Sequence, residues 1–326
     1  ASHNPPEYNG YKVYWEDGAQ ITPPHDTGIM AEVKKVTDYG ATKTMDKEEA
    51  KAAGLYVTIG KEIDDAFIAE LKSQVLHLDA IKEQQKNLKI VYTPLHGTGN
   101  IPARRVLKEL GFENVYVVKE QELPDGNFPT VSYPNPEAAE AFELGLKLAK
   151  EVDADLVLAT DPDADRLGVR VKDQDGVYHT LTGNMSGCLL ADYEIGQRKA
   201  LRGLPEDGVL IKTIVTTNMA DAIAKYYGVE LIEVLTGFKY IGQQILKFEQ
   251  TGKGTYLFGF EESYGCLIGT HARDKDAIVA TMALCEAAAY YKSQGKTLWD
   301  AMIELYERYG YYKDDIQSVS LKGVEG

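Results

Sequence analysis

Three aspartates at alternate positions, Asp161, Asp163 and Asp165, carry the strongest chemical signal in the sequence. They lie in residues 160–166 (TDPDADR), directly after an apolar run typical of a buried strand. Converging carboxylate oxygens suit a hard cation such as Mg²⁺, which keeps positions open for phosphate or water. An EF-hand calcium loop is excluded, because Arg166 and Lys172 replace its required Gly and Glu. A solvated acidic turn is the other interpretation, but three like charges at a strand end favour a cation site.

Groups suited to phosphoryl transfer lie beside these aspartates and near the start of the chain. Arg166 can hold phosphate by charge and by its two-pronged geometry, and a structural pair with one of the aspartates is an equal alternative. Ser2 and His3 belong to a Pro- and Asn-rich loop that also leads to Lys12. A hydroxyl, an imidazole and an ammonium can serve as nucleophile, acid or base, although a lone Ser-His pair is common by chance.

A second set of polar residues lies in the last third of the chain. Residues 259–265 (GFEESYG) offer Glu261 and Ser263 between glycines, a pattern that suits neighbouring sugar hydroxyls or, equally, a charged hairpin turn. Lys239 stands where a strand leads into a helix, so that it can meet an anion together with the helix N-terminus. A local basic cluster is formed by His271, Arg273 and Lys275.

The elements that must position these residues follow an alternating order. The pattern predicts strands at 88–92, 115–118, 155–159 and 167–171, with helices at 101–110 and 137–151. The order recurs with strands at 209–215, 230–235 and 255–260 and with helices ending at 227 and covering 238–250. Glycines at 111 and 228 end corresponding helices. We therefore predict an α/β fold of tandem repeated domains, each with a mixed, mostly parallel sheet flanked by helices.

The flanking segments are less regular. A short strand is predicted at 11–15 and a helix at 26–39, and 47–58 and 61–78 carry a mixed helical and apolar pattern. Long helices at 276–294 and 298–309 follow the second unit.

The composition excludes several classes of protein. With 326 residues and 44% hydrophobic content, the chain can fold into two or three domains. Its net charge of −15 argues against nucleic-acid or anionic-membrane partners, and no apolar run reaches the roughly 20 residues of a membrane span. No signal peptide and no obligate protein partner are evident. Three widely spaced cysteines predict buried thiols and a cytoplasmic location: Cys188, Cys266 and Cys285.

Taken together and in this order, residues 1–5, 161–166 and 261–265 resemble the phosphoserine, metal and sugar-specificity loops of the α-D-phosphohexomutase superfamily. Residues 93–99 and 273–276 further resemble a branch of bacterial phosphoglucomutases related to phosphopentomutases. The resemblance implies a remnant of the phosphoserine domain at 1–60, a metal-binding domain at 61–200 and a sugar-binding domain at 201–326. Because the chain lacks an initiator Met and matches only these parts, we expect a fragment that is inactive, or nearly so, by itself.

The resemblance also implies a mechanism. Ser2 would carry the transferred phosphate, and Mg²⁺ would be held by Asp161, Asp163, Asp165 and Ser2. Glucose 1-phosphate and glucose 6-phosphate would interconvert through a sugar bisphosphate, which also serves as activator. His3, Lys12, Arg166 and Lys239 would be catalytic, and the remaining substrate contacts would come from Glu261, Ser263, His271, Arg273 and Lys275.

Alternatives remain open. A phosphopentomutase or phosphomannomutase would use the same loops. A metal-dependent phosphatase would need no serine nucleophile, and a non-catalytic sugar-phosphate sensor would have no use for a phosphorylatable serine beside a metal loop.

Overall fold

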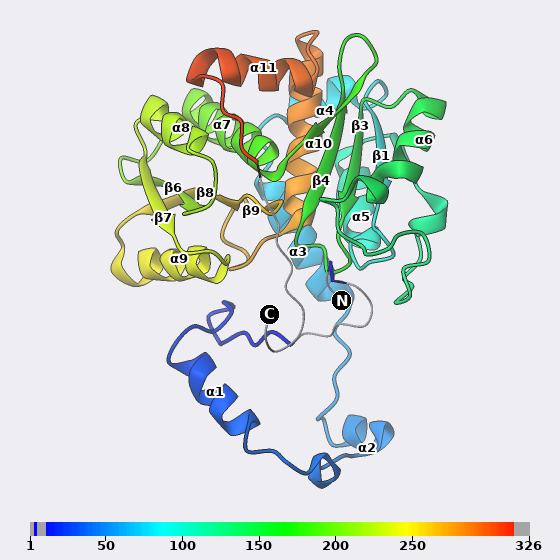
Figure 1. Ribbon diagram of the computed structural model, residues 1–326, viewed down its shortest axis with the longest axis vertical. Coiled ribbons are helices and arrows are strands. Elements are labelled where there is room, and N and C mark those ends of the chain that lie inside the picture. The colour runs from blue at the N-terminus through cyan, green and yellow to red at the C-terminus, as the bar shows by residue number, and fades with distance from the viewer. Residues whose placement is uncertain (1–2, 5–10, 316–326) are drawn as a thin grey trace.

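Two mixed sheets, each covered by helices, form the body of the protein (Figure 1). The computed structural model describes residues 3–4 and 11–315. In the first sheet the strand order is β2-β1-β3-β4-β5, with β1 parallel to β2 and β3, and with β4 and β5 antiparallel. The second sheet has the order β7-β6-β8-β9, and only β9 is antiparallel. The predicted tandem α/β fold is confirmed, although the first sheet has as many antiparallel as parallel pairings.

The strands that the sequence predicts lie close to their expected positions, and Tyr178–Leu181 forms an additional strand. Those of the first sheet are β1 (Lys89–Thr93), β2 (Asn114–Val117), β3 (Leu156–Thr160), β4 (Leu167–Lys172) and β5 (Tyr178–Leu181). Those of the second are β6 (Gly208–Thr213), β7 (Glu230–Val234), β8 (Thr255–Glu261) and β9 (Gly265–Leu267). The central strands β3 and β6 are buried along their whole length, which explains their continuous apolar runs.

The helices around these sheets end where the sequence signals predict. Gly111 ends α5 (Asn100–Leu110) and Gly228 ends α8 (Met219–Tyr227), both in the left-handed conformation that glycine adopts without strain. The helix predicted at 137–151 is a 3₁₀ turn at Ala139–Phe142 followed by α6 (Glu143–Val152). The other helices around the sheets are α9 (Lys239–Thr251), α3 (Lys61–Ser73) and α4 (Leu78–Gln84).

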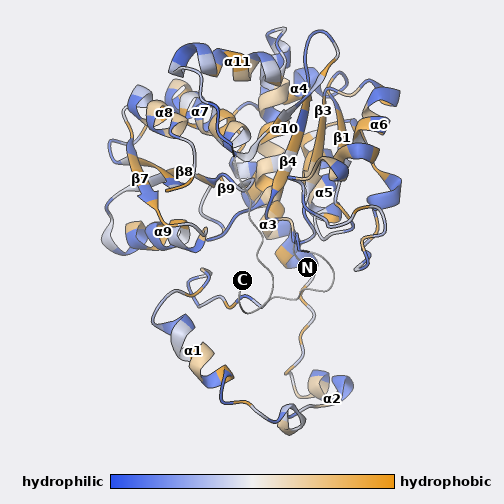
Figure 2. Cartoon of the chain, in the orientation of Figure 1, coloured by the Kyte–Doolittle hydropathy of each residue, from blue (hydrophilic) through white to orange (hydrophobic). Residues whose placement is uncertain are grey.

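A layer of helices between the two sheets joins them into one body. It contains α7 (Gly183–Arg202), which packs against strands of both sheets, and α10 (Ala277–Ser293), which is apolar on almost every face. Figure 2 shows the apolar residues gathered on the strands and on α10. Helix α11 (Leu298–Tyr309) closes this side and begins with a capping box at Thr297 and Asp300. The predicted domain boundary at 200 falls inside α7 and stays a prediction.

The segment from 21 to 60 contains no buried residue and extends away from the body (Figure 1). Within it lie α1 (His25–Val33), a 3₁₀ turn (Tyr39–Ala41) and α2 (Lys47–Ala52). The helix predicted at 26–39 is therefore shorter than expected, because a helix without a packing partner gains little stability from further turns. Within the mixed pattern of 47–58, only α2 is helical. The strand predicted at 11–15 is wrong: only Tyr14 forms a β-bridge, to Gln20. Within the described ranges, no helix combines the length and apolar character needed to cross a membrane.

Candidate active site

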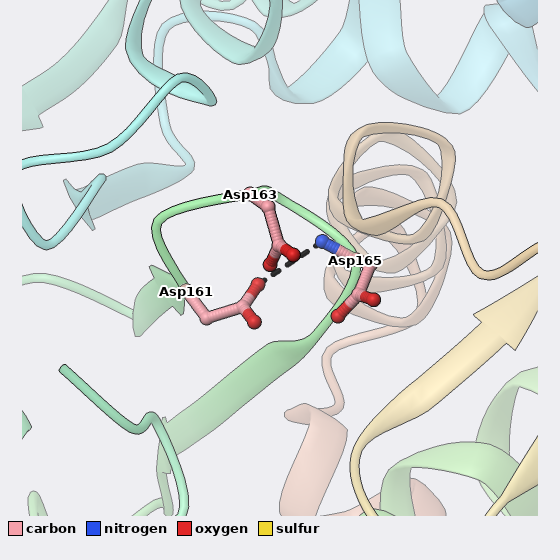
Figure 3. Close-up of side chains that lie close together, drawn as sticks. All are labelled: Asp161, Asp163 and Asp165. Atoms are coloured by element: carbon pink, nitrogen blue, oxygen red, sulfur yellow. Dashed lines mark hydrogen bonds between the residues drawn. The ribbon is translucent and has the colours of Figure 1, made fainter. Parts of the chain in front are cut away.

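The three predicted metal ligands converge on one point. Asp161, Asp163 and Asp165 lie on the loop that joins β3 to β4, and each offers an oxygen within 4.8 Å of the others (Figure 3). Asp161 is fully buried, and its Oδ1 accepts the backbone N–H groups of Asp165 and Arg166, both at 3.0 Å. These bonds curl the loop around the Asp161 carboxylate, so that one residue acts both as a candidate ligand and as the support of the loop.

The electrostatics of this loop favour a bound cation. Burial, followed by the charges of Asp165 and Asp163, raises the pKa of Asp161 well above its ordinary value. One oxygen of each aspartate is buried and has no hydrogen-bond partner in the structure: Asp161 Oδ2, Asp163 Oδ1 and Asp165 Oδ1. Buried carboxylate oxygens without partners are costly unless a cation or water satisfies them, and an all-oxygen set fits Mg²⁺. The residues present therefore fit the expected metal.

The loop at residues 94–99 packs against the metal loop and is hydrogen-bonded to it. Thr98 donates both its backbone N–H and its hydroxyl to the carbonyl oxygen of Pro162, at 2.8 and 3.0 Å. Gly97 passes so close that a Cβ at this position would lie 2.3 Å from the Cα of Pro162. The glycine is thus required by the close approach of the two backbones.

Replacing Gly97 by Ala is expected to push the metal loop out of place. The new Cβ meets backbone atoms that cannot rotate away, so we expect a loss of about 1–3 kcal/mol in the free energy of unfolding. We also expect Mg²⁺ to bind at least tenfold more weakly, because the displaced loop would no longer hold the aspartate ligands in position. Calorimetric titration and denaturant unfolding measure both quantities. Gly126→Ala is the matched control, since a Cβ there meets nothing within 4 Å; equal Mg²⁺ affinities for the two variants would contradict the prediction.

The cleft beside the metal loop brings together five of the predicted site residues: Arg166, Lys239, Glu261, Ser263 and Lys275. It has a volume of about 320 Å³ and is lined by Gln20, Arg166, Thr213, Thr236, Gly237, Phe238, Lys239, Glu261, Glu262, Ser263, Asp274 and Lys275. The two sheets meet here through their loops: the N–H of Leu167 donates to the carbonyl of Tyr264 at 2.9 Å, and that of Ala277 to Ala164 at 3.0 Å. The cleft therefore lies at the carboxyl ends of parallel strands, where open α/β sheets place ligands.

The cations of the cleft are held by carboxylates. Lys275 Nζ lies 3.1 Å from Asp165 Oδ2, and Lys12 Nζ lies 3.4 Å from the same oxygen. Burial acts to lower the pKa of Lys275, but Asp165, Asp274 and Glu261 together hold it above its ordinary value. Lys239 Nζ lies 3.8 Å from Asp26. Lys275 therefore stays charged, and together with Lys239 it lines the space that an anionic substrate would occupy.

Several partners of the site residues were not found by sequence reasoning. Arg166 donates to Glu137 at 2.7 Å, and burial raises the pKa of that glutamate. Glu262 accepts from the hydroxyls of Thr213 and Thr216, at 3.1 and 3.3 Å. Burial likewise raises the pKa of Glu261, despite the nearby Lys275. Glu137, Thr213 and Thr216 carry no local sequence signal, because their partners are 29 or more residues away.

The other predicted residues have different surroundings. His271 contacts Asp276 at 2.8 Å and Arg273 is paired with Glu249, and neither is among the residues that line the cleft. His3 is half-buried near Arg166, Asp165 and Asp163, and burial, then Arg166, lowers its pKa. Ser2 lies outside the described residues.

A larger hollow of about 530 Å³ lies at the opposite ends of β3 and β4. Two of the lysines that line it, Lys172 and Lys292, are paired with Asp153 and Asp155. Its third lysine, Lys296, is paired with Glu304. The metal loop, by contrast, has buried oxygens without partners, so the smaller cleft is the candidate site.

Comparisons with known proteins show the family of the chain. Models of phosphoglucomutase/phosphomannomutase α/β/α domains match the chain, with domain I at residues 1–40, domain II at 65–176 and domain III at 182–309. The phosphoglucomutase of Staphylococcus aureus (strain MRSA252) is 36% identical over 327 residues, which cover 100% of this chain and 57% of that protein. The chain thus spans little more than half the length of the curated relatives that it matches.

Solved structures show the same fold. A protein of Thermus thermophilus assigned as a phosphomannomutase has a TM-score of 0.72 at 25% identity, over 95% of this chain and 62% of that one. The N-acetylphosphoglucosamine mutase of Aspergillus fumigatus, in complex with GlcNAc-6P and magnesium, has a TM-score of 0.56 at 15% identity, over 93% and 71%. With three consecutive domain models and a relative at 36% identity along the whole chain, this protein belongs to the phosphoglucomutase/phosphomannomutase family.

Proposed function

We propose that this chain forms the metal-binding and sugar-binding part of a phosphoglucomutase, which interconverts glucose 1-phosphate and glucose 6-phosphate. One observation carries the proposal: a triad of aspartates with buried, unpartnered oxygens adjoins a cleft that contains Lys275, Lys239 and Glu261. The metal loop and the sugar loop come from different sheets and are bonded to each other through Leu167 and Tyr264. A metal, cations for phosphate and acceptors for sugar hydroxyls are the parts that phosphoryl transfer on a sugar needs.

Asp161, Asp163 and Asp165 would hold one Mg²⁺ together with the phosphate on Ser2. The magnesium-bound relative from A. fumigatus and the all-oxygen ligand set support this assignment. When bound, the ion would neutralise charge on the transferring phosphoryl group.

The protein groups would divide the remaining work. The phosphorus–oxygen bond to Ser2 would break as a sugar hydroxyl oxygen bonds to phosphorus. The Lys12 ammonium would donate a proton to the departing Ser2 oxygen and take up the proton of that hydroxyl in exchange, so that it acts as general acid and base. Reversal of the step from the second phosphate of the bisphosphate regenerates the phosphoserine. Glu261 and Ser263 accept and donate hydrogen bonds to sugar hydroxyls in either orientation of the intermediate.

The phosphate contacts would come from both sides of the cleft. Arg166 and His3 act beside the metal loop, and Lys239 and Lys275 bind the phosphate that does not react. His271 and Arg273, which lie outside the cleft lining, would reach the substrate only after a change of partners. A sugar bisphosphate would serve as activator, and the three free, buried cysteines support a cytoplasmic location.

A coupled assay of the natural protein tests the proposal. Glucose 1-phosphate, mannose 1-phosphate and ribose 1-phosphate are offered with Mg²⁺ and a trace of sugar bisphosphate, while free phosphate is followed. We expect isomerised product without phosphate release and the highest rate with glucose 1-phosphate; a Ser2→Ala variant is the control without nucleophile. Release of phosphate without isomerisation would indicate a phosphatase, and a faster rate with another sugar would reassign the substrate.

A further inference from the structure

A short turn near the start of the described chain contributes one residue to the lining of the cleft. Residues 13–21 fold back on themselves, with the N–H of Ile21 donating to Val13 and that of Trp15 to Ala19, both at 3.0 Å. Gln20, at its end, lines the cleft. The turn is therefore a folded part of the site and not a loose neighbour of it.

One side chain of this turn reaches the second sheet's side of the cleft. The Tyr14 hydroxyl donates to Asp274 Oδ2 at 2.8 Å. The other oxygen, Asp274 Oδ1, accepts both the backbone N–H of Lys275, at 2.8 Å, and its ammonium, at 3.0 Å. Because Tyr14 takes one carboxylate oxygen, only the second is left to Lys275.

The ammonium of Lys275 is consequently shared among three carboxylates. Besides Asp274 it lies 3.1 Å from Asp165 Oδ2, in the metal loop, and 3.9 Å from Glu261 Oε1, in the sugar loop. Its side chain is only 8% exposed and runs past Gly265, where a Cβ would lie 2.0 Å from its Cδ. The stem is fixed by this passage, so the orientation of Asp274 decides where the ammonium points.

We propose that Tyr14 is a positioning residue, which fixes the Asp274 carboxylate and through it directs Lys275 toward the space between the metal loop and the sugar loop. The inference rests on the proposed function, since it assigns Lys275 to the phosphate of a bound sugar phosphate. Without the Tyr14 hydroxyl, Asp274 turns both oxygens toward Lys275 and withdraws the ammonium from the cleft.

Tyr14→Phe tests this role, because it removes one oxygen atom from a residue whose ring is retained. Calorimetric titration of the chain with glucose 1-phosphate in excess Mg²⁺ should show affinity about tenfold lower than that of the unaltered chain, the size of a lost hydrogen bond to a charged group. Mn²⁺ affinity and the unfolding midpoint should stay close to their original values. Tyr11→Phe is the matched control, since Tyr11 is 93% exposed in the same segment.

A double-mutant cycle with Asp274→Asn shows whether Tyr14 acts through Asp274. We expect the double variant to bind glucose 1-phosphate no more weakly than Asp274→Asn alone. Additive losses, unchanged affinity in Tyr14→Phe, or a parallel fall in Mn²⁺ affinity and unfolding midpoint would each overturn the positioning role. If the unaltered chain itself fails to bind glucose 1-phosphate, the proposed function fails and the inference falls with it.

Discussion

Replacing Asp163 by Asn is expected to lower the affinity for Mg²⁺ by at least about 100-fold, since removing contacts that merely support a ligand already costs roughly 10- to 100-fold. Asn keeps the shape of the side chain but removes the negative charge at a buried oxygen that has no partner in the structure. The loop itself should survive, because its backbone bonds end on Asp161 and not on Asp163. Calorimetric titration with Mg²⁺, or spin-resonance titration with Mn²⁺, measures the loss.

The same substitution should leave the metal-free protein at least as stable as before. The triad places three carboxylates within reach of one another, and the charge of Asp163 is one cause of the raised pKa of Asp161. Removing one charge relieves this repulsion when no cation is present. Asp175→Asn, on the exposed β4–β5 turn, controls for the loss of charge alone. Unchanged Mg²⁺ affinity would remove Asp163 from the ligand set, and a large loss of stability in chelator would indicate that the loop had collapsed.

A single glutamate of α7 is expected to make the stability of the protein depend on pH around neutrality. Glu194 is 1% exposed and pairs with Arg198 at 3.0 Å. Burial raises its pKa from 4.5 to about 7, against the opposing charge of Arg198. Between these two values the folded state holds a proton that the unfolded state releases. The contribution of the Glu194 proton to the free energy of unfolding is therefore fully present below pH 4.5. It is lost as the pH rises through about 7, a change of roughly 3 kcal/mol.

Denaturant unfolding at about pH 5 and pH 8 measures this effect. Glu194→Gln imitates the neutral carboxyl at every pH, so its free energy of unfolding should fall less over this range than that of the unaltered chain, by roughly 3 kcal/mol. Glu151→Gln, on the exposed face of α6, is the control and should retain the original pH dependence. Parallel pH profiles for Glu194→Gln and the unaltered chain would show that Glu194 is ionised in the folded state throughout.

Local sequence signals were sufficient for the elements and for the metal loop. The strands before Asp161 and Glu261 are continuous apolar runs, and the glycines at 111 and 228 end their helices as predicted. The three aspartates converge because they occupy alternate positions of one tight loop, which places their side chains close together. Their spacing in the sequence was therefore sufficient to predict the cluster. These features depend on neighbours within a few residues, which is the range over which propensity and periodicity act.

The segments whose structure was predicted incorrectly lack the tertiary partners that a strand or a long helix needs. Residues 11–15 have β-forming side chains but gain only one bridge, since a strand requires a partner that its own sequence does not specify. The predicted long helix after Pro24 ends at Val33, and α1 has no buried residue to stabilise further turns. Helix α7 was not predicted from the sequence, although it packs against strands of both sheets.

The sequence by itself determined the alternating α/β order, the acidic loop and the resemblance to a phosphosugar mutase. Only the tertiary structure decided which distant groups pair with one another in and around the cleft: Arg166 with Glu137, Lys275 with Asp165, and Tyr14 with Asp274. These pairs are 29, 110 and 260 residues apart, as the numbering shows. Their contacts depend on how α7 and α10 pack the two sheets together, and that packing is set by the whole core rather than by any local run of residues.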